Sequence, residues 1–313
     1  MPIKSKLLLI ASMILTTLSS GTQAQEPLST IKAFIKDDCL AIAYIDLTSV
    51  DLNHCIDWAA SQNLLEPEVV PEVKKMAEPV REALRSVTDA GIEHVVAVFH
   101  PSDFLVANND LQLFLLFSVA DGHEPEQALE TLKPILPRLN LVEFSMEISN
   151  GTILGGFESQ IERAKTGSAL EITRFTNAWK KFGGQDAGVM FFGNKDARRA
   201  IRELFPKLES PFENVTGKLI ADEVDCLGLS LSLPKKVEEV IEVDGRLVVQ
   251  TTNAQAAGVV NQALKETTNL LADSEFSDQW PSIVTNAIDR LESKVESNDV
   301  VIELKPILNG IGK

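Results

Sequence analysis

The sequence predicts an α+β protein made of two tandem, related units with mainly antiparallel sheets. Three observations carry this prediction. Short apolar strands alternate with amphipathic helices along the chain. Asn150-Gly151 and Asp244-Gly245 each lie between two apolar runs, where both residues of a tight hairpin turn must accept positive φ. Each predicted hairpin leads directly into a helix, and this shared order indicates an internal repeat.

The first 24 residues have the features of an export signal. Lys4 and Lys6 precede an apolar run from Leu7 to Leu18, and small residues follow up to Ala24. The apolar run is shorter than the roughly 20 residues that a membrane span needs. No cysteine follows for lipid attachment. We therefore expect cleavage after Ala24 and a mature chain, starting near Gln25, that is periplasmic or secreted.

Residues 25–168 form the first predicted unit, whose order of elements matches the split, ferredoxin-like βαββαβ plan. Its first strand, residues 39–45, alternates large Ile42 and Tyr44 with small Ala41 and Ala43, which predicts a thick layer on one face and a thin layer on the other. The other predicted elements are helices at 54–60 and 68–88, strands at 95–99 and 111–119, a helix at 124–136, a hairpin at 141–148 and 152–154, and a helix at 158–165.

The predicted helix at 68–88 has an apolar stripe, the pattern of a helix that packs on a core. Its members are Val69, Val73, Met76, Val80, Ala83, Leu84 and Val87. We expect Pro79 to bend this helix and Gly91 to mark its end. The two strands that follow are apolar on both faces, which predicts cover on both sides.

Residues 169–313 form the second predicted unit, and the seam is expected within 166–185, where Gly167, Gly183 and Gly184 interrupt the pattern. Its predicted elements are a strand at 189–192, a helix at 196–208, a strand at 227–233, a hairpin at 240–243 and 247–251, helices at 254–271 and 283–294, and a last strand at 300–304. Residues 146–154 and 241–248 echo each other around the two turns, with Ser149 as one extra residue.

This order of features resembles a group of uncharacterised exported bacterial proteins with tandem α+β units. The features are an export signal, an acidic break at Asp37-Asp38, an apolar strand followed by Asp46-Leu47, and later Asp-Gly hairpins that lead into helices. The resemblance covers most of the mature chain as a pattern. It implies the architecture and supplies no chemistry.

The balance of charge disfavours two classes of partner. The chain carries 29 basic and 45 acidic side chains, a formal net charge of −16, and loss of the export signal removes two of the basic ones. Such a chain repels nucleic-acid phosphates and anionic lipid headgroups, so we expect neither as a partner. Surplus acidic residues also serve solubility. No second apolar stretch is long enough for a membrane span, so none is expected in the mature chain.

Cysteine and histidine are too sparse to predict a metal centre. Cys39 and Cys55 could form a disulfide, or all three cysteines, with Cys226, could be small buried apolar side chains. His94 and His100 lie roughly 20 Å apart along one strand, too far to bind one metal, and are interpreted as solvated strand ends. We expect no structural transition metal and no cofactor.

His123 is open to two interpretations. With Asp121 and Glu124 it could form a loose divalent-cation site, or the three residues could be a polar turn before the next helix. The turn is the interpretation we prefer.

No catalytic motif is present. The sequence lacks Gly-x-Ser-x-Gly and any phosphate-binding loop, and Gly155-Gly156 and Gly183-Gly184 are interpreted as turns. Glu147 and Glu242 occupy matching positions in the two predicted hairpins, and both are expected to face solvent, which does not favour a catalytic role.

One cluster of basic residues is a candidate anion-binding site: Lys195, Arg198, Arg199 and Arg202, on the helix predicted at 196–208. Asp196 and Glu203 could instead neutralise it. Our hypothesis is a non-enzymatic exported protein that binds a protein or an anionic envelope polymer. The alternatives are a secreted hydrolase with Asp and Glu as acid and base, and a structural, envelope-associated subunit.

Overall fold

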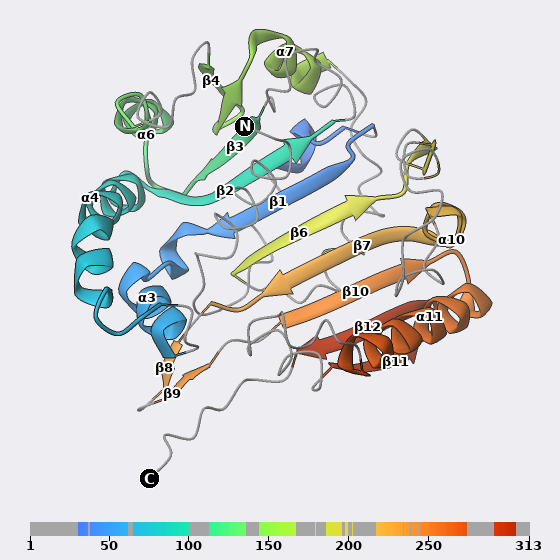
Figure 1. The fold of residues 1–313 in the computed structure, drawn as a ribbon. Helices are drawn as coiled ribbons and strands as arrows, with labels where there is room; N and C mark the ends of the chain where they lie inside the picture. Colours follow the sequence, from blue (N-terminus) through green and yellow to red (C-terminus); the bar gives the residue numbers. More distant parts are fainter. Residues whose placement is uncertain are drawn as a thin grey trace.

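The computed structural model describes residues 31–304, except for 37, 62–64, 101–112, 136–143, 167–178, 180–185, 196–197, 200–201, 203–216, 234, 238–239, 243–244 and 274–290. Within these ranges, ten strands form one antiparallel sheet and two short strands form a separate ribbon (Figure 1). The α+β class and the antiparallel sheet are confirmed.

The first half of the chain supplies half of the large sheet and the helices beside it. Its elements are η1 (Lys32–Phe34), β1 (Ala41–Asp46), η2 (Leu47–Ser49), α3 (Leu52–Ser61), α4 (Val70–Asp89), β2 (Ile92–Phe99), β3 (Phe114–Val119), α6 (Pro125–Leu132), β4 (Ser145–Ser149), β5 (Thr152–Gly156) and α7 (Glu158–Thr166).

The second half supplies the remaining strands. Its elements are β6 (Ala187–Phe192), α10 (Gly217–Glu223), β7 (Val224–Leu231), β8 (Lys235–Val237), β9 (Val240–Glu242), β10 (Gly245–Thr251), α11 (Ala254–Asp273), β11 (Leu291–Glu296) and β12 (Asp299–Leu304).

The two halves meet at the centre of the large sheet, where β1 pairs antiparallel with β6. Outward from this pair the order is β1-β2-β3-β5-β4 on one side and β6-β7-β10-β12-β11 on the other. This order differs from the split ferredoxin-like plan predicted for the first half. That plan places another strand between the first two, whereas β1 and β2 are direct antiparallel neighbours.

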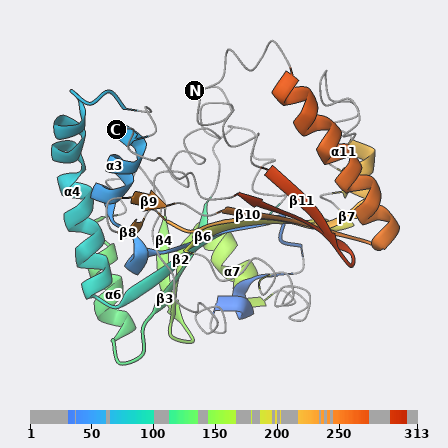
Figure 2. The same ribbon diagram turned by 90° about the horizontal axis from the view of Figure 1, so that it is seen from below.

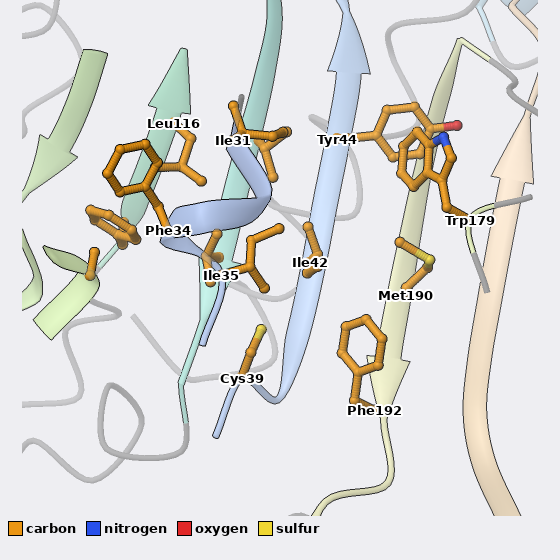
Figure 3. Close-up of a cluster of buried hydrophobic side chains, with 14 of the residues drawn as sticks. Ile31, Phe34, Ile35, Cys39, Ile42, Tyr44, Leu116, Trp179, Met190 and Phe192 are labelled. Carbon is orange, nitrogen blue, oxygen red and sulfur yellow. The ribbon is translucent and has the colours of Figure 1, made fainter. Parts of the chain in front are cut away.

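Helices lie on both sides of the sheet (Figure 2). We call the face that carries Ile42 and Tyr44 the first face; η1, α7 and Trp179 pack on it in the largest apolar cluster (Figure 3). On the opposite, second face, α4 and α6 pack over the β2–β4 side and α10 and α11 pack over the β7–β12 side.

The size alternation along β1 has the predicted consequence. Ile42 and Tyr44 belong to the large cluster on the first face, while Ala41 and Ala43 belong to a small cluster with Phe99 on the second face. Because strand side chains alternate between faces, the size of the residues along β1 indicates how thick the apolar layer is on each face of the sheet.

Helix α4 confirms the predicted element but not the burial of its whole stripe. Val87 is buried, whereas Met76 and Val80 are 72% and 59% exposed. The amphipathic pattern predicted a helix correctly, but it did not reveal that only the C-terminal end of that helix reaches the sheet.

The first predicted hairpin is confirmed and the second is wrong. Asn150 and Gly151 turn between β4 and β5 with φ of 50° and 76°. In the second half, β9 pairs with β8 in the small ribbon, and β10 pairs with β7 and β12. The apolar side chains of β10 are therefore used in the large sheet, so β9 and β10 do not form a hairpin.

The helix predicted at 283–294 is also wrong where the structure describes it. Residues 291–296 form strand β11, which pairs with β12 around a turn at Ser297, whose φ is 58°. Pairing with β12 overrides the local helical pattern. No helix in the described ranges is long and apolar enough to cross a bilayer.

Candidate functional site: a polar row across the central strands

A row of polar side chains crosses the first face where β1 ends. Strand pairing places Asp46 opposite His94, His94 opposite Ser118, and Ser118 opposite Thr152. Asp186 lies just before β6, and its carbonyl accepts a hydrogen bond from the Asp46 amide at 2.7 Å. We call these five residues the polar row; they come from five neighbouring segments of one sheet.

A β-bulge helps to place His94 in this row. The pairing of β2 with β3 shifts register between Ile92 and His94, so Glu93 is the extra residue. Ile92 therefore packs in the cluster under α4 and α6, while His94 reaches Ser118 on the other face. Bulges often redirect a side chain in this way.

The His94 ring is held in a largely buried position. Its Nδ1 lies 3.1 Å from Oγ of Ser118, and its side chain is 13% exposed. Burial lowers the pKa of His94, while the nearby carboxylates of Asp46 and Glu93 act in the opposite direction. The neutral imidazole is thus the favoured form, because burial penalises the charged one.

The two aspartates of the row stabilise local backbone. Asp46 Oδ1 accepts from Thr48 N at 2.9 Å and Oδ2 accepts from Ser49 Oγ at 2.9 Å, which caps η2. Buried Asp186 accepts from Leu233 N at 2.9 Å through Oδ2. A buried carboxylate is tolerated when backbone donors form hydrogen bonds with it. Both aspartates therefore stabilise the backbone at this edge of the row.

An aromatic pair adjoins the row. Tyr44 and Trp179 have ring centroids 4.1 Å apart with a 59° tilt (Figure 3). Gly188 lies opposite Tyr44 on β6, and a Cβ there would be 2.6 Å from Cε1 of Tyr44. Burial, then the charges of Asp186 and Asp46, raise the pKa of Tyr44, so its hydroxyl stays protonated.

The row contains Asp, His and Ser, but its geometry differs from that of a hydrolytic triad. In such a triad the serine is open to substrate and the aspartate holds the far nitrogen of the histidine. Here Ser118 is buried and Asp46 is engaged by η2. The Oγ of Thr152, also buried, has no hydrogen-bond partner in the described structure. Because Ser118 is buried and hydrogen-bonded to His94, the arrangement suits the packing of the sheet better than nucleophilic attack.

The opposite ends of the same strands hold a second buried polar group. His100 is buried, and its Nδ1 lies 3.0 Å from Oδ1 of Asp38. Cys39 directs its thiol to the carbonyls of Ala41 at 3.2 Å and Phe99 at 3.6 Å. The interpretation of His94 and His100 as solvated strand ends is therefore wrong, because strands of the sheet and packed segments cover both.

The predicted basic cluster is only partly open to a ligand. Arg198 donates to the carbonyl of Gly193 at 2.6 Å and to Oδ1 of Asp225 at 2.6 Å, and it also reaches carbonyls of α10. Arg202 is paired with Asp222, and this pair lowers the pKa of Asp222. Lys195 and Arg199 are exposed. Arg198 thus fastens the segment after β6 to α10 and β7; Asp196 and Glu203, the other predicted partners, lie outside the described residues.

The remaining candidates have ordinary structural positions. Cys39, Cys55 and Cys226 are buried free thiols, so the Cys39–Cys55 disulfide is not formed. Glu147 pairs with Lys165 of α7 at 2.5 Å. The ring of His123 packs over Gly91 after α4, in the turn before α6. In the described ranges no three His, Cys, Asp or Glu side chains are arranged to hold a metal ion.

Comparisons with known proteins identify no family for this chain. No family model matches the sequence, and no curated protein matches it. A solved structure, crystal form I of TP0453, aligns with 88% of this chain and 91% of its own, at a TM-score of 0.37 and 10% identity. Neither family nor function follows from a likeness of this size.

Local sequence patterns could hardly predict the polar row. Its members lie far apart in the chain, and only strand pairing brings them together. The available signal was a polar residue at the end of each apolar strand, such as Asp46 and Ser118, and that signal does not specify which strands are neighbours.

Proposed function

We propose that this chain is an exported, non-enzymatic protein of the periplasm or cell envelope that works by binding another protein. The single observation that carries the proposal is the exposed apolar stripe of α4, where Met76 and Val80 are 72% and 59% exposed. Residues four apart lie side by side on a helix, so the two form one apolar contact surface. Amphipathic helices commonly recognise partners through such anchors.

Polar contacts with α3 hold this surface in place. Lys74 pairs with Asp57 at 2.6 Å, and Arg81 donates to Oδ1 of Asn53 at 2.9 Å. These contacts fix α4 on its α3 side. Met76 and Val80 then project into solvent from a positioned helix, which reduces the ordering cost of binding.

The net charge of the chain supports one kind of partner. Helix α4 exposes both signs of charge near Met76, with Glu72 and Lys75 among them, whereas the chain as a whole is strongly acidic. Electrostatic complementarity favours a partner surface with apolar side chains and basic residues around them. An anionic polymer is less well supported, because Arg198 and Arg202 already bind acidic side chains of this protein.

Site-specific crosslinking in the native host tests the proposal. A photo-reactive residue at position 76 or 80 should capture the same envelope protein, whereas one at Arg85, an exposed position toward the other side of α4, should not. The double variant Met76→Glu, Val80→Glu should lose the crosslink from a reporter at position 72 while its melting temperature stays unchanged. Equal capture at 76 and 85, or capture that survives the double variant, would rule out this surface.

We also propose that residues 25–168 and 169–313 are related units. The matching strand orders support this: in each half the third strand counted from the centre, β3 or β10, is followed by a helix and a terminal hairpin. On this basis the counterpart of the Asn150-Gly151 turn is the turn at Ser297, not Asp244-Gly245. Structures of the two halves should superpose strand for strand in that order, and a superposition that needs another pairing would contradict it.

A further inference from the structure

Arg246 occupies an unusual position on the first face of the sheet. It lies on β10, directly opposite Ser230 of β7 and Glu303 of β12. The side chain is partly buried, and its Nε is fully covered. This is the β7–β10–β12 side of the sheet, on the face opposite the one on which α4 packs.

The covered Nε of Arg246 has no hydrogen-bond partner in the described part of the chain. Arg198, by contrast, is paired with Asp225, and Arg202 with Asp222. Burying a charged guanidinium donor without a hydrogen-bond partner is costly.

The two side chains opposite Arg246, those of Ser230 and Glu303, form hydrogen bonds with groups other than its guanidinium. Glu303, which could neutralise it, accepts a hydrogen bond from Lys294 at 2.9 Å. This bond is the largest cause of the raised pKa of Lys294. The hydroxyl of buried Ser230 points to the carbonyl of Arg246 at 3.4 Å and not to its guanidinium. Neither of these two neighbours compensates this partly buried cation, which lies in a chain of net charge −16.

We propose that Arg246 is the anchor of an anion-binding site that takes a carboxylate or phosphate group of a ligand. A covered guanidinium donor without an acceptor is costly, and a carboxylate or phosphate supplies two acceptors in the geometry that arginine prefers. General attraction cannot draw an anion to so acidic a protein, so recognition has to be local. This site is separate from the α4 surface and stands independently of it.

Calorimetric titration of the mature chain with inorganic phosphate, and separately with acetate, tests the proposal and distinguishes the two ligand chemistries. Sodium chloride at the same ionic strength is the reference. The wild type should show saturable binding of at least one anion. Arg246→Gln should bind it roughly tenfold or more weakly, the equivalent of a lost charged hydrogen bond. Arg85→Gln, which removes an exposed arginine of α4, should bind like the wild type.

A second variant tests the geometry and does not depend on how Arg246→Gln folds. Lys294→Met removes one hydrogen-bond donor of Glu303, whose carboxylate should then be drawn toward Arg246 and compete with the anion, so that affinity falls. The proposal is overturned if the wild type binds neither anion, if Arg246→Gln binds as well as wild type, or if Lys294→Met leaves the affinity unchanged. Thermal unfolding of all variants in chloride provides the check on folding.

Discussion

At the scale of single residues, the polar row shows that a sheet can bury a polar side chain, such as His94, that the sequence pattern predicts to be solvated. His94 is in contact with Ser118 and near two carboxylates, yet burial is the largest influence on its pKa. The same residue is thus a structural part of the sheet whose protonation is linked to folding.

This position makes stability depend on pH. The pKa of His94 is lower in the folded chain than its ordinary value of about 6.5, so the unfolded chain takes up the proton first as the pH falls. The contribution of His94 to stability is therefore complete above about pH 6.5 and is lost progressively below it. Urea unfolding at pH 7.5 and 5.5 should show a smaller loss for His94→Gln than for wild type. His123→Gln, a change at an exposed histidine before α6, should behave like wild type; the same loss in all three would contradict this account.

A second residue-scale prediction concerns the close approach of β6 and β1. In Gly188→Ala the new Cβ would lie 2.6 Å from Cε1 of Tyr44 and 2.8 Å from the carbonyl oxygen of Leu229. The backbone atom cannot move away within a paired sheet, so we expect a loss of roughly 1–3 kcal/mol in the free energy of unfolding. Gly258→Ala is the control, because nothing lies within 4 Å of its Cβ position in α11. This variant should be slightly more stable than wild type, by about 0.5–1 kcal/mol. Chemical denaturation measures both.

At the scale of elements, turns with positive φ set the register of the hairpins. Gly151 has φ of 76° and open space around its Cβ position, so Gly151→Ala should act through the backbone alone. We expect it to cost roughly 1–2 kcal/mol, the price of a left-handed conformation for an L-residue with a side chain. Equilibrium unfolding gives the value, and an amide spectrum that changes only around β4 and β5 would show that the fold is kept. No change in stability would mean that the turn relaxes to another type.

The elements also show where pattern and pairing disagree. The predicted helices α3, α4, α7 and α11 are present because their amphipathic repeats are long enough to be distinctive. The segment 291–294 resembled a helix and is a strand, since β12 offers it a full antiparallel partner. The conformation of a short segment with a mixed pattern is determined by the element on which it packs or with which it pairs.

At the scale of the whole molecule, the pairing of β1 with β6 joins the two halves. Ala41, Ile42, Ala43 and Tyr44 are all buried, on both faces of β1. Separation of the halves would expose an unpaired, apolar edge, which promotes aggregation. Residues 25–168 and 169–313 produced separately should therefore be insoluble or associated, and co-expression should yield a soluble one-to-one complex. Size-exclusion chromatography with circular dichroism measures this, and a stable monomer of either half would show that the seam is not required.

Local sequence patterns were enough to predict the α+β class, the positions of most helices and strands, and the Asn150-Gly151 turn. Periodicity, residue size and turn chemistry are local properties, so they can be derived from neighbouring residues. Which strands pair could be seen only in the folded structure. Strand pairing in turn produces the polar row, the contact of Arg198 with Asp225 and the covered position of the Arg246 Nε. The physical reason is that pairing joins residues far apart in the chain. A shift of one position moves every side chain to the other face.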